Sequence, residues 1–72
     1  MSIECLNEEL QRTRKALQHL IRSNDELRAA LSESKDPDFK IAIEENIVVI
    51  AKNRARVVSL EEEIKRMEAG AS

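Results

Sequence analysis

Apolar side chains recur at alternating intervals of three and four residues through the first half of the chain. In a helix, this spacing places them along one side, where a second helix can cover them. The pattern predicts one long helix over residues 3–34. The positions on its apolar side, which we call the first seam, are Ile3, Leu6, Leu10, Thr13, Leu17, Leu20, Asn24, Leu27 and Leu31.

The second half of the chain repeats the same spacing. It predicts a second helix over about residues 38–68, with Gly70 as a plausible stop beyond its end. The positions of this second seam are Phe39, Ile43, Asn46, Ile50, Asn53, Val57, Leu60, Ile64 and Met67.

Residues 35–37 are predicted to form the turn between the two helices. Asp36 is suited to the N-cap, because its carboxylate can accept hydrogen bonds from the free amides that begin a helix. Pro37 suits the first helical position, where its missing N–H is not needed. Because a proline disfavours helical backbone at the residue before it, the first helix should end near Ser34.

The two seams match each other when the chain folds back at this turn. Leu27 then faces Ile43, Asn24 faces Asn46, and every other layer follows without a slip. The fold class predicted is therefore all-α, a two-helix antiparallel coiled-coil hairpin. It forms a single domain over residues 1–72, with dimerisation into a four-helix bundle left open.

The layer of Asn24 and Asn46 is polar within an apolar seam. We expect the two side-chain amides to hydrogen-bond across the seam, because a buried Asn fixes the register of paired helices. The alternative is a site where this pair meets a partner protein, together with Arg22, Ser23 and Glu45.

Ile47 and Val48 lie off the second seam, and Ile21 lies on the same flank of the hairpin as Ile47. A helix that is apolar on several sides is usually covered on several sides. These side chains are therefore predicted either to hold a second copy in a four-helix bundle or to bind another protein.

Composition narrows the function. The 72 residues are 36% charged, with one cysteine and a net charge of −2, which argues against nucleic acid as a partner. No apolar run is long enough to span a membrane. A lone Cys5 favours a reducing compartment, so we expect a cytoplasmic protein, with the nucleus as an alternative.

No residue pattern indicates a catalytic, metal-binding or cofactor-binding site. His19 and Cys5 fall at outward positions without companion ligands, and the run Glu61, Glu62 and Glu63 is interpreted as solvated. No metal, cofactor or catalytic residue is predicted, and we do not expect an enzyme.

Two stretches carry a family resemblance. Residues 19–27 read His-Leu-Ile-Arg-Ser-Asn-Asp-Glu-Leu, and the second helix adds Lys40, Ile43, Glu45, Asn46, Val49, Arg56, Val57, Leu60 and Glu61. This pattern resembles the yeast ATPase-dedicated proteasome assembly chaperone family, also described as translation-machinery-associated, although the link between the helices is shorter here. The resemblance implies a chaperone that binds ATPase subunits of the proteasome regulatory particle and assists assembly of its base.

Two other readings stay open. One is a structural coiled-coil subunit or dimerisation module of a larger complex. The other is a prefoldin-like or tubulin-cofactor-like chaperone, which also uses antiparallel helices.

Overall fold

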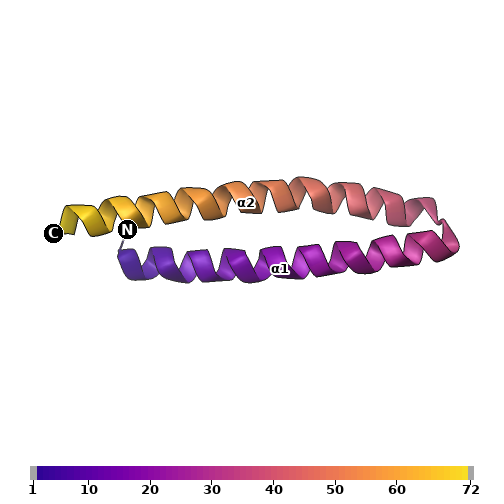
Figure 1. Ribbon diagram of the computed structural model, residues 1–72, viewed down its shortest axis with the longest axis horizontal. Coiled ribbons are helices and arrows are strands. Elements are labelled where there is room, and N and C mark those ends of the chain that lie inside the picture. The colour runs from indigo at the N-terminus through magenta and orange to yellow at the C-terminus, as the bar shows by residue number, and fades with distance from the viewer. Residues whose placement is uncertain (1, 72) are drawn as a thin grey trace.

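The computed structural model describes residues 2–71. It contains two helices, α1 (Ile3–Ser34) and α2 (Pro37–Ala71), which lie side by side and run in opposite directions (Figure 1). Together they form a rod 56 Å long and 15 Å across. The prediction of an antiparallel helical hairpin is confirmed, while dimerisation stays a prediction.

Both ends of α1 are capped. The Ser2 side chain accepts a hydrogen bond from the Cys5 amide at 3.1 Å, and α1 ends at Ser34. Lys35 then adopts the left-handed conformation with φ of 54°, and its amide donates to the Leu31 carbonyl at 2.8 Å. This conformation costs a residue other than glycine about 1–2 kcal/mol, so the turn is held at some expense to stability.

The start of α2 confirms the role predicted for Asp36. Its carboxylate accepts a hydrogen bond from the Asp38 amide at 2.9 Å. The helix is nevertheless longer than predicted, because it includes Pro37 and continues through Gly70 to Ala71. The predicted stop at Gly70 was wrong. Glycine ends a helix by adopting a positive φ, and Gly70 does not adopt one.

The seams form the core, and every seam position is buried or half-buried. The best-packed part lies near the two termini, at the open end of the hairpin. There Leu6 and Leu10 pack with Leu60 and Ile64, and Val57 and Met67 close the cluster. Each fully buried aliphatic side chain contributes about 1.5–3 kcal/mol.

Two ion pairs join the helices on either side of this open-end core. Arg14 binds Glu61 at 3.0 Å, and Arg56 binds Glu9 on the other flank. The hydrogen bond to Glu9, and then its negative charge, raise the pKa of Arg56. The glutamate run is exposed to solvent at Glu62 and Glu63, and Glu61, whose side chain is 44% exposed, also binds Arg14.

Candidate protein-binding surfaces

Asn24 is the one buried polar side chain among the described residues, with 1% of its surface exposed. Its Nδ2 donates to the backbone carbonyl of Ile43 at 3.3 Å, while its Oδ1 has no partner. The predicted hydrogen bond to the Asn46 amide is absent from the described residues, so that expectation was wrong. A backbone carbonyl has two lone pairs, and that of Ile43 can take the Asn24 amide besides its helical bond.

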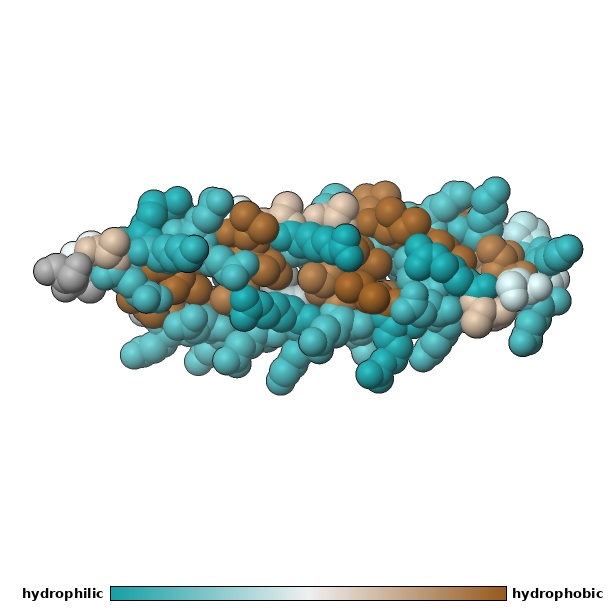
Figure 2. Space-filling model, viewed as in Figure 1, coloured by the Kyte–Doolittle hydropathy of each residue, from teal (hydrophilic) through white to brown (hydrophobic). Residues whose placement is uncertain are grey.

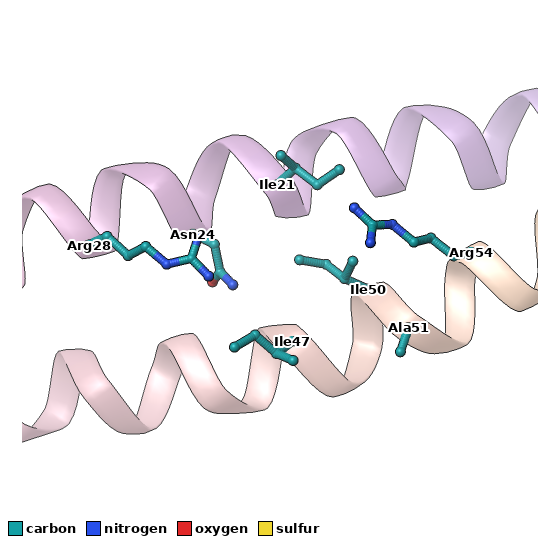
Figure 3. Close-up of a pocket in the computed structure, with 7 residues that line it drawn as sticks. All are labelled: Ile21, Asn24, Arg28, Ile47, Ile50, Ala51 and Arg54. Carbon is teal, nitrogen blue, oxygen red and sulfur yellow. The ribbon is translucent and has the colours of Figure 1, made fainter.

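A groove of about 250 Å³ opens between the helices at this level. It lies on the turn side of the open-end core, between the middle parts of α1 and α2, and Figure 3 shows the side chains that line it. Its lining consists of Ile21, Asn24 and Arg28 from α1 and Ile47, Ile50, Ala51 and Arg54 from α2.

The groove is apolar in its centre and cationic at its ends. Arg28 and Arg54 enter from opposite ends and reach toward each other over the isoleucines between them (Figure 3). No acidic residue lines it. Arg28 makes one ion pair at the long distance of 3.5 Å with Asp25 of its own helix. Arg54 forms no hydrogen bond or ion pair within residues 2–71.

The register of the hairpin explains this composition. Arg14 and Glu61 face each other on the groove's flank and form an ion pair. One heptad closer to the turn, Ile21 takes the place of Arg14 and Arg54 that of Glu61. One heptad further, Arg28 stands opposite Ile47. Each level of the groove thus pairs an arginine with an isoleucine instead of an acid.

A second apolar surface lies on the outer side of α2. It consists of Ile41, Val48 and Val58, each about half exposed. Figure 2 shows hydrophobic surface over α2 and along the line between the helices, whereas the α1 edge is mostly hydrophilic. Because burial of these side chains would be favourable, this uncovered row is a candidate contact surface.

Comparison with known families identifies the group to which this hairpin belongs. The family model of the TMA17 helical domain matches residues 1–69. The chain belongs to the TMA17 family. TMA17 stands for translation machinery-associated protein 17, and the family is that of the ATPase-dedicated proteasome assembly chaperone. The resemblance seen in the sequence is confirmed, and membership indicates a role related to proteasome assembly.

Searches of curated proteins and of solved structures give no match. The assignment to the TMA17 family therefore depends on the family model, which covers nearly the whole chain.

The residues proposed from sequence as a partner site are spread around this TMA17-family hairpin. Ile21, Asn24 and Ile47 line the groove together, as the register predicts. The other five lie outside the groove. They are Arg22, Glu45 and Val48, which are exposed, and Ser23 and Asn46, which are half-buried. Successive helical residues point about 100° apart, so a run such as residues 22–24 does not form one surface.

The prediction from sequence did not include four of the residues that line the groove, which are Arg28, Ile50, Ala51 and Arg54. The signal was available for the two arginines, because they occupy the same flanking heptad position as Ile21 and Ile47. The predicted register, applied to the flanks as well as to the seam, would have placed Ile21, Arg28, Ile47 and Arg54 side by side.

Other chemistry is limited in the part of the chain that the structure describes. Cys5 and His19 are exposed, and no group of three or more His, Cys, Asp or Glu side chains is placed to hold a metal ion. Across residues 2–71, neither helix contains a stretch long and apolar enough to cross a membrane.

Proposed function

We propose that this chain is a non-enzymatic chaperone that binds ATPase subunits and assists assembly of the proteasome regulatory particle base. Membership of the TMA17 family supports the proposal, since that family is described as the ATPase-dedicated proteasome assembly chaperone family. The cytoplasm, with the nucleus as an alternative, is the location that we propose for it.

The observation that carries the proposal is the uncovered apolar surface of α2. Val48 is 55% exposed although it is a branched aliphatic residue, and it lies away from the seam. Burying such side chains fully would contribute up to about 1.5–3 kcal/mol each. A rod with one apolar outer side is suited to lie against another protein and to hold it during assembly.

The experiment compares two substitutions at equivalent outward positions. Val48→Asp places a carboxylate on the apolar side of α2, and Ala29→Asp makes the same change on the outer side of α1, where Ala29 is exposed. Both variants should keep the helicity and melting temperature of the parent, because outward positions tolerate charge. Purified ATPase subunits of the base are then presented to each immobilised hairpin.

We expect the parent and Ala29→Asp to capture ATPase subunits and to accelerate base assembly, and Val48→Asp to lose both activities. A parent hairpin that captures no ATPase subunit would contradict the proposal.

A second candidate is a structural dimerisation module, favoured by the row of Ile41, Val48 and Val58 along one side of a helix. Such a row also suits helix packing against a second copy of the chain. Analytical ultracentrifugation separates the two. A parent dimer that Val48→Asp converts to monomer, without any capture of ATPase subunits, would favour the structural module.

A further inference from the structure

We propose that the groove between α1 and α2 binds an acidic amphipathic helix, whose apolar side chains contact Ile21 and Ile47 and whose carboxylates pair with Arg28 and Arg54. The inference deepens the proposed function, because it gives the chemical character of a protein segment that the hairpin holds. It concerns the groove and is independent of the outer surface at Val48.

The first argument is the mismatch along the groove. At the open end, the same flank closes with a cross-helix ion pair, Arg14 with Glu61. In the groove an acid is missing at both levels, and the isoleucines opposite the arginines are 36% and 47% exposed. Arg28 pairs only with Asp25 of its own helix, at 3.5 Å, Arg54 has no ion pair within residues 2–71, and both isoleucines stay partly exposed. A single ligand that presents both carboxylates and apolar side chains would satisfy all four.

The second argument is charge. Toward the turn, exposed Lys40 occupies the same flanking heptad position of α2 as Ile47 and Arg54. From the turn to the Arg14–Glu61 ion pair, this flanking heptad position therefore carries three cationic side chains, while Glu44, one heptad before Ala51, is an acidic residue beside it. Asp25, on the neighbouring face, only partly offsets Arg28, at 3.5 Å. Guanidinium groups pair well with carboxylates, because their fork geometry permits two parallel hydrogen bonds.

The third argument concerns a second copy of the chain as the occupant of the groove. A symmetric pairing of this flank with itself would place Arg28, Lys40 and Arg54 of one copy against those of the other. Like charges brought together at an interface are strongly unfavourable. The cationic flank therefore disfavours self-association through the groove and favours an acidic partner.

The shape of the groove gives the conformation of the ligand. The groove lies between two helices that run side by side (Figure 1), and apolar residues line it at two successive heptad levels. A helix with apolar residues at every third or fourth position fits such a furrow along its length. Acidic residues on both sides of that apolar stripe would then lie against the arginines.

The test uses three synthetic peptides of three heptads each. The first has leucine at both seam positions of every heptad and glutamate at the flanking positions. The second replaces each glutamate by lysine, and the third keeps the glutamates but replaces each leucine by serine. Binding to the full hairpin is measured by fluorescence anisotropy at low and at physiological salt.

We expect the leucine–glutamate peptide to bind about ten-fold or more tightly than either control, with affinity falling as salt rises. Equal binding of the lysine peptide would overturn the inference by showing apolar contact alone. Equal binding of the serine peptide would overturn it by showing a non-specific cationic surface.

Charge reversal in the hairpin locates the contact. The double variant Arg28→Glu with Arg54→Glu should lose the leucine–glutamate peptide and bind the lysine peptide instead. The matched control is Arg12→Glu with Arg22→Glu, which makes the same charge change at two exposed positions of α1. It should behave like the parent. Circular dichroism establishes that both variants keep the fold, and an equal loss in both would place the contact elsewhere.

The outcome also separates this inference from the proposed function. If ATPase subunits bind the hairpin and the acidic peptide does not, the inference is wrong and the function stands. If the acidic peptide binds through the two arginines and no ATPase subunit is captured, the groove is correctly assigned and the proposed function is wrong.

Discussion

The open end and the middle of the hairpin follow the same heptad spacing but fill it differently. At the open end, Leu6 and Leu60 face inward with only 1% of their surface exposed. In the middle, the seam includes Asn24, Asn46 and Asn53, and the one fully buried side chain among these three, that of Asn24, has an unpaired oxygen. The open end therefore contributes most of the packing energy, and the middle contributes less.

The flanks differ in the same way. The open end is closed on both flanks by ion pairs that join the helices, whereas the middle has an open groove with arginines and isoleucines on its walls. A hairpin that needed only to be stable would continue the leucine layers and the ion pairs to the turn. The difference agrees with the proposal that the open end stabilises the rod and the middle binds a partner.

The largest effect on stability is expected from a substitution in the open-end core, and it tests whether the two regions differ in packing. Leu60→Ala should lower the free energy of unfolding by about 2–5 kcal/mol, because it opens a cavity in the best-packed layer. The same substitution at Leu27, which is half-buried and closer to the turn, should cost clearly less. Urea unfolding followed by circular dichroism measures both. Equal losses would show that the two regions do not differ in packing.

An intermediate effect is expected at the buried asparagine. Asn24→Leu should raise the free energy of unfolding by about 1–3 kcal/mol. The substitution removes a buried acceptor that has no hydrogen-bond partner, and it loses only one long hydrogen bond in return. The gain should be the same with Asn46 intact and with Asn46→Ala, since no hydrogen bond joins the two amides in the described residues. If the effect of Asn24→Leu on thermal unfolding depended strongly on Asn46, the two side-chain amides would interact after all.

The smallest effect on stability is expected when a cross-helix ion pair like that of the open end is introduced in the middle. Ile47→Glu places a carboxylate opposite Arg28, as Glu61 stands opposite Arg14. The stability should change by less than about 1 kcal/mol, as is usual for exposed ion pairs. Binding of the acidic peptide should nevertheless be lost, whereas Ile47→Gln should weaken it only in part. A large loss of stability would mean that Ile47 serves the fold instead of a partner.

Much of the architecture was predictable from local chemistry. The heptad spacing gave both helices, and Asp36 with Pro37 gave the place of the turn, because capping and proline geometry act within a few residues. The end of α2 was misjudged at Gly70, since a glycine permits a helix to stop without requiring it. Of the residues that line the groove, Ile21, Asn24 and Ile47 were predicted to meet a partner protein, and the two arginines were recoverable from the register.

The sequence by itself determined the two helices, their antiparallel pairing and the flank on which the isoleucines lie. Each follows from periodicity and from the constraint that facing layers impose on one another. Only the tertiary structure decided that Asn24 bonds to the backbone of Ile43, that its oxygen stays unpaired, and that the middle opens into a groove between two arginines. Those features depend on how closely the helices approach at each layer. That approach is set by the combined volumes and rotamers of side chains from both helices, which the spacing along either one does not contain.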